Sequence, residues 1–299
     1  MIDIITLNYN SLKYTKMFVQ TLFKNTSDPF RLIIVDNAST EPGTTEFLAK
    51  LEQKHPNVFV HRNEVPDSGF AEGNNTGLQY CDSEFVALIN NDILIPANKK
   101  WLNQLLRHFE DPEVGLVTCK LLYPNDTIQF AGGFLVKNAF STLNCFYHRG
   151  RFEDAQKYSQ AEQVPQATFA MVIARRKEFG TLDTSYKMGT FEDNDKCMEY
   201  LKKGKKIIYD GTVYLYHYES RTTLSRPDFV NQSARNSDLF RKRWLPFIWN
   251  SVTQNPAFWG WTREDLVREI QICFSQDIYW TSEIRLHIHD WIKIIDEVK

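Results

Sequence analysis

The chain has 299 residues, of which 42% are hydrophobic and 24% charged, and this composition is typical of a globular protein. Its formal net charge of −2 excludes a global attraction to nucleic acid or to an anionic membrane. Five scattered cysteines without a CxxC pair exclude a disulfide framework and a cysteine-rich zinc site, and they indicate a reducing compartment. The N-terminal residues are too polar for a signal peptide, and no segment is long and apolar enough for a membrane span. We therefore expect a cytoplasmic protein, with any membrane association limited to its periphery.

Strand-like and helix-like segments alternate over the first 120 residues. Short apolar runs predict strands at Ile2–Leu7, Arg31–Val35, Val58–His61 and Phe85–Ile89. Helical spacing of apolar residues predicts helices at Tyr14–Phe23, Thr44–Gln53, Gly73–Tyr80 and Trp101–Phe109. Because continuously apolar strands alternate with helices, we expect an α/β fold with a Rossmann-like, mostly parallel central sheet covered by helices on both faces.

Polar residues directly follow three of the predicted strands. Asn8 follows the first strand, Asp36 the second, and Asn90-Asn91-Asp92 the fourth. Ligands of parallel sheets bind at the carboxyl ends of the strands, so these side chains are expected along one edge of one sheet. Asp92 is the most informative of them, because the chain becomes apolar again at once and a buried carboxylate is costly unless it is paired. A backbone donor, a lysine or a bound cation could satisfy it.

Three common motifs are absent from the sequence. There is no GxGxxG after the first strand, no GxxxxGK[ST] and no HExxH. Their absence argues against a dinucleotide-binding fold, a P-loop enzyme and a zinc protease of the HExxH type.

The second half of the chain is less regular. A strand is predicted at Gln166–Ala174, a helix from Phe191 or Glu192 to Gly204, and two short strands at Lys205–Tyr209 and Thr212–Tyr216, the latter ending at His217. The first turn of the predicted helix is rich in acids, which suits the positive end of the helix dipole. These acids are Glu192, Asp193 and Asp195.

The last quarter of the chain is predicted to form a helical, aromatic-rich extension. Helices are expected at Phe229–Trp244, Thr262–Phe274 and Ser282–Val298, with an aromatic and proline-rich segment at Leu245–Gly260. This divides the chain into a main domain at 1–225 and an extension at 226–299. The apolar helix faces must meet the main domain, a second subunit or a membrane surface. Few basic residues accompany them, which favours intramolecular packing or a homodimer over a membrane surface.

Carboxylates and one imidazole together suggest a site for Mg²⁺ or Mn²⁺. A divalent cation would neutralise Asp92 and could bind a diphosphate, while a nearby carboxylate acts as general base on an incoming hydroxyl. Each residue also has an ordinary structural explanation. Acids are common at helix N-termini, and a histidine at a strand end, such as His217, is more often a hydrogen-bonded structural residue than a ligand.

The order and spacing of several short motifs resemble those of family 2 glycosyltransferases with the GT-A fold, of the type found among bacterial rhamnosyl- and galactofuranosyltransferases. The resemblance extends from residue 2 to about residue 225. The motifs are ITLNYNS at 5–11, IIVDNAST at 33–40, GFAEGNNTG at 69–77, ALINNDILIP at 87–96, DPEVGLV at 111–117, AGGF at 131–134, FEDNDKCMEYLKKGKKIIY at 191–209 and LYH at 215–217.

This resemblance implies specific roles for individual residues. Asp193 aligns with the general base of inverting members, Glu192 is the alternative base, and Asp92 with His217 would hold Mn²⁺ or Mg²⁺. An acceptor hydroxyl deprotonated by Asp193 would attack the anomeric carbon as the nucleoside diphosphate leaves. Asn90-Asn91-Asp92 keeps only the last acid of the family's DxD-like motif, which predicts a modest metal affinity. The expected nucleotide-binding residues are Thr6, Asn8, Asp36, Asn37, Asn75 and Asn91.

Two alternatives to a glycosyltransferase remain open at this point. One is a catalytically silent relative that binds a nucleotide sugar. The other is a sugar-phosphate nucleotidyltransferase, which would need a glycine-rich basic loop near the N-terminus that LNYNSLKYTK does not supply.

The substrates follow from the resemblance only as classes. The donor is expected to carry UDP, dTDP or GDP, and the acceptor to be a glycan of polysaccharide biosynthesis. The basic residues Arg235 and Arg241–Arg243 beside aromatic helices leave a lipid-linked, protein or nucleic-acid acceptor open, although the nucleic-acid signal is weak.

Overall fold

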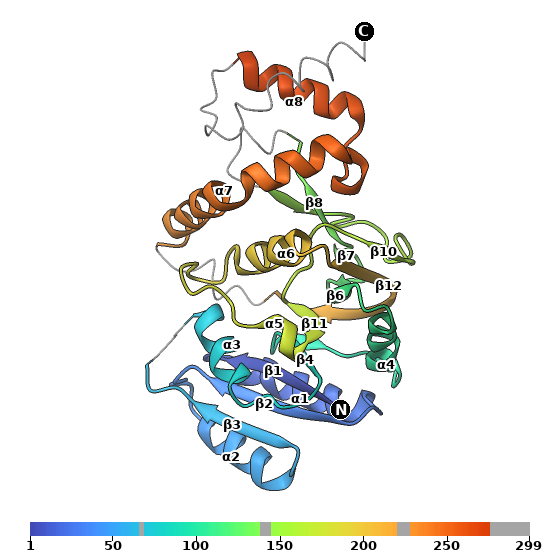
Figure 1. Ribbon diagram of the computed structural model, residues 1–299. Coiled ribbons are helices and arrows are strands. Elements are labelled where there is room, and N and C mark those ends of the chain that lie inside the picture. The colour runs from blue at the N-terminus through green and yellow to red at the C-terminus, as the bar shows by residue number, and fades with distance from the viewer. Residues whose placement is uncertain (66–68, 138–144, 220–227, 276–299) are drawn as a thin grey trace.

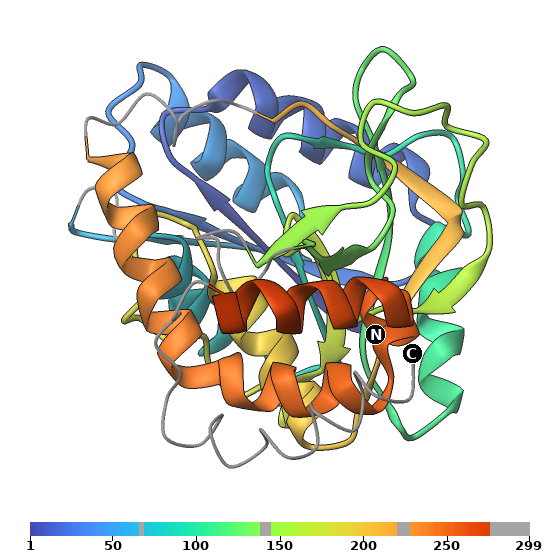
Figure 2. The same cartoon turned by 90° about the horizontal axis from the view of Figure 1, so that it is seen from above.

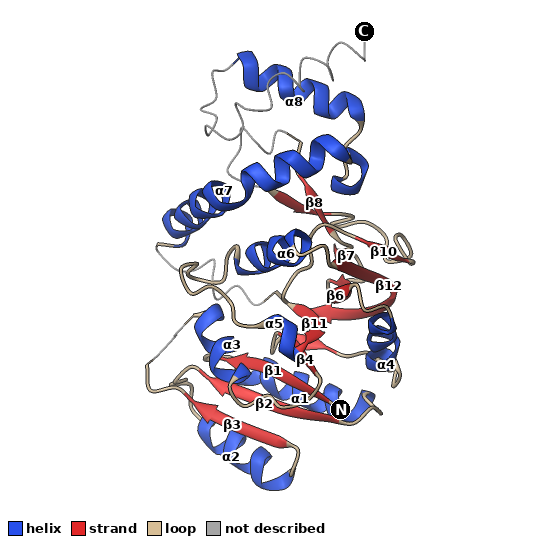
Figure 3. Ribbon diagram, viewed as in Figure 1, coloured by secondary structure: helices blue, strands red, loops and turns tan. Residues whose placement is uncertain are grey.

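Figure 1 shows the computed structural model of the chain, which describes residues 1–65, 69–137, 145–219 and 228–275. Within these residues, ten strands form the central sheet in the order β10-β12-β6-β11-β4-β1-β2-β3, with β5 paired to β12 and β7 to β6. Two further strands, β8 and β9, form a small separate sheet. Figure 3 shows how the helices surround these strands. The expected α/β class is confirmed.

The bounds of the elements are as follows. The strands are β1 (Ile2–Asn8), β2 (Phe30–Asp36), β3 (Val58–Arg62), β4 (Phe85–Ile89), β5 (Ile93–Leu94), β6 (Val114–Leu122), β7 (Ile128–Phe130), β8 (Gly133–Leu135), β9 (Phe146–His148), β10 (Ala161–Gln163), β11 (Met171–Arg175) and β12 (Lys206–His217). The helices are α1 (Leu12–Asn25), α2 (Thr44–Lys54), α3 (Phe70–Leu78), α4 (Trp101–Leu106), α5 (Arg176–Phe179), α6 (Glu192–Lys202), α7 (Phe229–Gln254) and α8 (Arg263–Ser275). Two 3₁₀ turns are η1 (Arg107–Glu110) and η2 (Pro256–Trp259).

The strand directions bring many strand ends to one edge of the sheet. β3, β2, β1 and β4 pair in parallel, and β12 pairs in parallel with β6. β11 lies between β4 and β6 and is antiparallel to both. Because two antiparallel steps restore the direction, β6 and β12 run the same way as β4. The carboxyl ends of all these parallel strands therefore lie at the same edge, together with the start of β11.

Helices cover both faces of the sheet, as Figure 2 shows with α1 and α2 on one side and α3 and α6 on the other. Alternation along β1 explains this arrangement. The Asn8 side chain meets Thr15 of α1, whereas Ile5 points to α3. At Gly77 of α3, an added Cβ would lie 2.6 Å from a methyl group of Ile5, so glycine permits the close approach of helix and strand.

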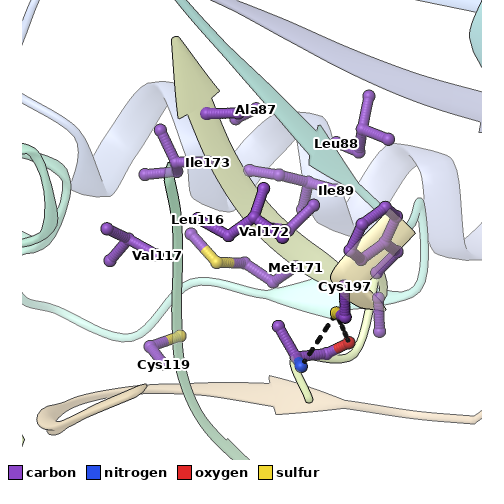
Figure 4. Packing of buried hydrophobic residues seen from close by; sticks show 14 of the residues in the cluster. Ala87, Leu88, Ile89, Leu116, Val117, Cys119, Met171, Val172, Ile173 and Cys197 are labelled. Atoms are coloured by element: carbon purple, nitrogen blue, oxygen red, sulfur yellow. Dashed lines mark hydrogen bonds between the residues drawn. The ribbon is translucent and has the colours of Figure 1, made fainter. Parts of the chain in front are cut away.

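The middle of the core is formed by β4, β11 and β6, whose apolar side chains interdigitate in Figure 4. Met171, Val172 and Ile173 of β11 are all buried there. Cys197 of α6 packs at the border of this cluster and its Sγ lies 3.3 Å from the backbone N of Ala167. This contact fixes α6 to the segment that leads into β11.

Two strand predictions need correction. The strands predicted at 205–209 and 212–216 form the single strand β12, which begins at Lys206, because a bulge between Asp210 and Tyr214 replaces the predicted break. The Asp210 carboxylate accepts hydrogen bonds from the backbone and hydroxyl of Thr212, which holds the bulge. The strand predicted at Gln166–Ala174 forms only from Met171 onward.

β6 was not predicted at all, although all nine of its residues are buried. Polar residues hide its strand character in the sequence. Lys120 is one of them, and its buried ammonium group donates to the carbonyls of Ala155 and Lys157 at 2.7 Å each. The strand is thus a buried one whose charge is satisfied only by tertiary contacts.

The C-terminal part packs against the rest of the chain. α7 continues ten residues beyond the predicted end at Trp244 and passes through Pro246, so the predicted end of this helix is wrong. Burial of Ile248, Trp249 and Val252 keeps the later turns helical despite the backbone N–H that the proline lacks. The Trp261 indole donates to the Leu135 carbonyl at 3.0 Å.

Two predictions for the C-terminal part concern residues that the structure does not describe. The helix at 282–298 and the boundary at residue 225 lie outside the described part of the chain, so the division into two domains stays a prediction. Among the described helices, none has the length and apolar character that crossing a bilayer requires.

Candidate active site

A polar network joins the ends of the first, second and fourth strands. Asn8 and Asp36 are register neighbours in β1 and β2, and the Asn8 amide donates to Asp36 Oδ1 at 2.7 Å. Thr15 of α1 donates to Asn8 Oδ1 at 2.6 Å, and the Asn91 amide donates to Thr15 Oγ1 at 2.8 Å. The expectation that these strand ends meet at one edge is confirmed.

The Asp36 carboxylate is wholly buried and already saturated by protein groups. Besides Asn8, it accepts hydrogen bonds from the hydroxyl and backbone of Ser39 and forms an ion pair with Arg62. Arg62 ends β3, and its side chain is 42% exposed, so it is the charged group of this network that a ligand can reach. Sequence reasoning missed Arg62, although its place directly after the predicted third strand, Val58–His61, was a usable signal.

Two other predicted nucleotide-binding residues, Thr6 and Asn37, lie in different surroundings. Thr6 is buried on the same face of β1 as Asn8, and its hydroxyl meets no hydrogen-bond partner within the described residues. Asn37 Oδ1 accepts from the Asn63 amide at 2.7 Å.

Asn75 is engaged in a structural contact that the sequence did not indicate. Its amide donates to the Leu182 carbonyl at 2.9 Å, and its carbonyl accepts from the Leu182 backbone at 2.8 Å. The side chain thereby joins α3 to a distant loop. Nucleotide binding by Asn75 stays a prediction, and both ends of its carboxamide are used here by the protein.

Asp92 and His217 meet at the same edge of the sheet. β5 and β12 pair antiparallel so that His217 lies opposite Ile93, the neighbour of Asp92. His217 Nε2 lies 3.1 Å from Asp92 Oδ1, and both side chains are largely buried. On the other side of the ring, His217 Nδ1 lies 2.6 Å from Gln129 Oε1.

This pair fits a hard divalent cation. Adjacent ligands of an octahedral ion with bonds of about 2.1 Å are about 3 Å apart, which matches the 3.1 Å between His217 Nε2 and Asp92 Oδ1. No set of three or more His, Cys, Asp or Glu side chains suited to a metal occurs in the described part of the chain. Magnesium-type sites commonly have few protein ligands and complete their shell with water and substrate phosphates.

Asp193 lies in the first turn of α6 and has the properties of a general base. Burial raises the pKa of its carboxyl group to about 6, against the opposing effect of hydrogen bonds from the backbone of Asn194 and Phe169. The Asn194 N–H lies 2.8 Å from Asp193 Oδ1. A pKa near 6 leaves the group ionised at neutral pH and basic enough to accept a proton.

Glu192, the other candidate base, is more deeply buried, with 3% of its surface exposed. Burial raises its pKa well above the ordinary value, and the nearby charges of Asp193 and Glu72 add to this shift. Its Oε1 accepts a hydrogen bond from the Gly189 backbone at 3.1 Å. These surroundings favour the neutral acid, so Asp193 is the better base of the two.

Backbone contacts connect Asp193 to the turn that carries Asp92. The Phe169 backbone bonds to the Asp193 carboxylate, and the next carbonyl, that of Ala170, accepts from the Asn90 backbone at 2.9 Å. The candidate base and the candidate metal ligand therefore flank the same short stretch at the start of β11.

Asp195, the third acid of this turn, is an anchor for α7. Its Oδ1 accepts hydrogen bonds from the Tyr186 hydroxyl at 2.9 Å, Arg243 at 2.8 Å and the Trp244 indole at 2.6 Å. Two of these donors belong to α7, so the buried carboxylate attaches α7 to α6, the helix that carries Asp193.

Comparison with known proteins identifies the family. The sequence profile described as Glycosyl transferase family 2 matches residues 3–179. The chain belongs to this family. The matched region contains Asp36, Asp92 and the strands from β1, apart from its first residue, to β11, whereas α6 and β12 lie beyond it.

Two curated relatives are 27% and 30% identical to this family 2 chain over the residues that align. An uncharacterised protein, y4gI, of Sinorhizobium fredii is 30% identical over 239 residues, covering 76% of this chain and 25% of the relative. The O-antigen biosynthesis protein RfbC of Myxococcus xanthus is 27% identical over 212 residues, covering 69% of this chain and 16% of the relative. The chain thus spans a quarter or less of the length of these relatives.

Solved glycosyltransferase structures share the fold. The mannosyltransferase PcManGT of Pyrobaculum calidifontis, solved with GDP-Man and Mn²⁺, has a TM-score of 0.55 at 16% identity and covers 95% of this chain and 77% of its own. GalNAc-T7, solved with UDP, GalNAc and Mn²⁺, has a TM-score of 0.59 at 13% identity and covers 73% of this chain and 43% of its own. The GT-A architecture expected from the sequence is confirmed.

Proposed function

We propose that the protein is an inverting glycosyltransferase that moves a sugar from a nucleoside diphosphate to an acceptor hydroxyl. The observation that carries this proposal is the contact of Asp92 with His217 at the carboxyl edge of the sheet, with Asp193 bonded to the Phe169 backbone beside the residue that pairs with Asn90. A cation-binding pair and a base with a raised pKa are the two chemical functions that such a transfer needs.

Asp92 and His217 would hold the divalent cation at the donor diphosphate. Bound there, Mn²⁺ or Mg²⁺ supplies Lewis-acid stabilisation of the departing diphosphate charge. Their oxygen and imidazole donors suit either ion. The Mn²⁺ in the two neighbouring structures supports a divalent cation without distinguishing the two.

Asp193 would accept the proton of the acceptor hydroxyl. Attack of that oxygen on the anomeric carbon, opposite the leaving diphosphate, gives inversion in one displacement. The Gln166 amide lies 3.4 Å from Asp193 Oδ2, and backbone donors bind the same carboxylate, so the carboxylate is held in one place.

The donor and the acceptor are proposed as classes. UDP, dTDP and GDP sugars are the candidate donors, and UDP and GDP-Man in the neighbouring structures support the first and last. A glycan acceptor is supported by the O-antigen biosynthesis name of one relative. A cytoplasmic location, with action at the periphery of the membrane or as a homodimer through the C-terminal helices, completes the proposal.

The test is calorimetric titration of the purified protein with UDP, dTDP, GDP and CMP, each with and without Mn²⁺. Asp92→Ala is the decisive variant, and Asp111→Ala is its matched control because Asp111 is an exposed carboxylate bonded to Lys206. We expect one nucleoside diphosphate to bind in a manner that needs Mn²⁺ and Asp92 but not Asp111.

Two outcomes would contradict the proposal in different ways. Binding of no nucleotide would favour a catalytically silent relative. Tight binding that is indifferent to Mn²⁺ and to Asp92→Ala would retain a nucleotide site but remove the metal from it.

A further inference from the structure

Gln129 occupies an irregular position in the sheet next to the candidate metal pair. In the pairing of β6 with β7, Leu121 lies opposite Phe130 and Leu122 opposite Ile128. Gln129 is therefore the extra residue of a β-bulge. Bulges redirect a side chain and are over-represented beside active sites.

The bulge aims the Gln129 side chain at His217. The glutamine is 4% exposed, and its Oε1 lies 2.6 Å from His217 Nδ1. A carboxamide oxygen only accepts hydrogen bonds, so Nδ1 carries the hydrogen and donates it. In the neutral ring this leaves a lone pair on Nε2, the atom that lies 3.1 Å from Asp92 Oδ1.

Backbone contacts hold the bulge on both sides. The buried His148 ring hydrogen-bonds to the Gln129 backbone. Next to it, the Ile128 backbone donates to Glu153 at 2.8 Å and accepts from Phe152 at 2.7 Å. The direction of the glutamine side chain is thus set by the fold.

The other end of the carboxamide is not satisfied. Gln129 Nε2 is buried and meets no hydrogen-bond partner within the described residues. A buried donor without a partner costs roughly 1–3 kcal/mol. A methionine or leucine would fill this position without that cost, so packing alone does not account for a glutamine here.

We propose that Gln129 is a positioning residue that selects the tautomer of His217 whose Nε2 can bind the divalent cation. The inference rests on the proposed role of His217 as a metal ligand. An acceptor on the far ring nitrogen orients the imidazole and increases its basicity, and loss of such a partner weakens metal binding about 10- to 100-fold.

The test measures Mn²⁺ affinity directly, by electron paramagnetic resonance titration of Mn²⁺ alone into the full chain. We expect Gln129→Leu to raise the dissociation constant about 10- to 100-fold. Gln129→Glu should keep the affinity within a few-fold or tighten it, because a carboxylate also accepts from Nδ1–H. Thr118→Val is the matched control. It removes a buried hydrogen bond of 2.8 Å between Thr118 of β6 and the Met171 carbonyl of β11, and neither residue belongs to the proposed metal pair.

A second measurement needs neither a bound metal nor a folded Gln129→Glu variant. Long-range ¹H–¹⁵N correlation spectra of histidine-labelled protein distinguish the two ring tautomers, and His217→Gln assigns the signal. The metal-free wild type should keep Nδ1 protonated, whether Nε2 is bare or shares a proton with Asp92 Oδ1 3.1 Å away, and Gln129→Leu should lose the preference for a proton on Nδ1.

Unchanged Mn²⁺ affinity in Gln129→Leu, or a wild-type ring protonated at Nε2 alone, would overturn the role of Gln129. His217→Gln separates this failure from that of the metal site itself. If His217→Gln also leaves Mn²⁺ affinity unchanged, the proposed metal site is wrong. If it abolishes binding while Gln129→Leu does not, only the positioning role is wrong.

Discussion

The ends of β1–β3 and the region of Asp92, His217 and Asp193 lie at the same edge of one sheet. They differ in how far protein groups satisfy their carboxylates. Around Asp36, both carboxylate oxygens accept hydrogen bonds from protein donors, and the charge is paired with Arg62. Around Asp193, the carboxyl pKa is raised to about 6.

The difference indicates a structural role for the first region and a chemical role for the second. A network whose members satisfy one another stabilises the strand ends and shapes the surface that faces a ligand. Carboxyl groups with pKa values raised by burial cluster at functional sites, because chemistry needs groups poised to change their protonation state. We therefore expect substitutions in the first region to affect stability and those in the second to affect turnover.

The largest expected effect comes from Asp193→Asn. Removing a general base lowers turnover by about 10²- to 10⁴-fold, measured as release of nucleoside diphosphate from the donor that calorimetry identifies. Nucleotide affinity should stay within a few-fold, because the side chain does not belong to the proposed metal pair. Glu192→Gln is the matched variant, and its effect should be much smaller because Glu192 is already held towards its neutral form. Equal losses in both variants, or a larger loss in Glu192→Gln, would reassign the base.

Asp36→Ala tests the first region. Removing one partner of a buried ion pair costs about 3 kcal/mol of unfolding free energy, measured by urea denaturation. The substitution also removes the acceptor of hydrogen bonds from Asn8 and Ser39. Arg62→Gln should cost about 1 kcal/mol, because the arginine is 42% exposed and can be replaced by water at Asp36. If Asp36→Ala left the free energy of unfolding unchanged, the network would not stabilise the strand ends.

Asn236→Leu tests how firmly α7 supports the start of α6. The buried Asn236 amide donates to the Lys187 carbonyl and the Thr190 hydroxyl at 2.7 Å each, and so holds a loop with positive φ at Met188 and Gly189. Loss of these bonds should cost about 1–3 kcal/mol of stability and lower turnover more than nucleotide affinity. Asp238→Ala, an exposed neighbour in an ion pair with Lys242, should change stability by less than about 0.5 kcal/mol. If the two variants behave alike, the loop is held by other contacts.

The last expected effect is a pH dependence near neutral pH. Burial raises the pKa of Asp193 from 3.8 to about 6, so the ionised base is lost as pH falls through 6. Donor turnover should be constant above this pH and fall about tenfold per pH unit below it. The same raised pKa opposes folding above pH 6 and not below 3.8, so Asp193→Asn should raise the thermal midpoint at pH 7. A flat pH profile with unchanged folding would remove the base assignment.

Local patterns in the sequence determined the first half of the fold. Apolar runs and helical spacing located β1–β4 and α1–α4 to within a few residues. Such strands are buried on both faces and alternate with helices. This pattern leaves few possible topologies, and a parallel sheet is the one it favours. The polar residues at their ends then marked the functional edge, and the ordered motifs identified the family.

Tertiary contacts decided the rest. The insertion of β11 between β4 and β6, the bulge at Gln129 and the pairing of Asp36 with Arg62 depend on residues far apart in the chain. α7 passes through Pro246 because burial of its later residues outweighs the lost hydrogen bond. The sequence by itself encodes local periodicity and residue chemistry, whereas the partner of a buried polar group and its pKa are set by neighbours that only the folded chain brings together.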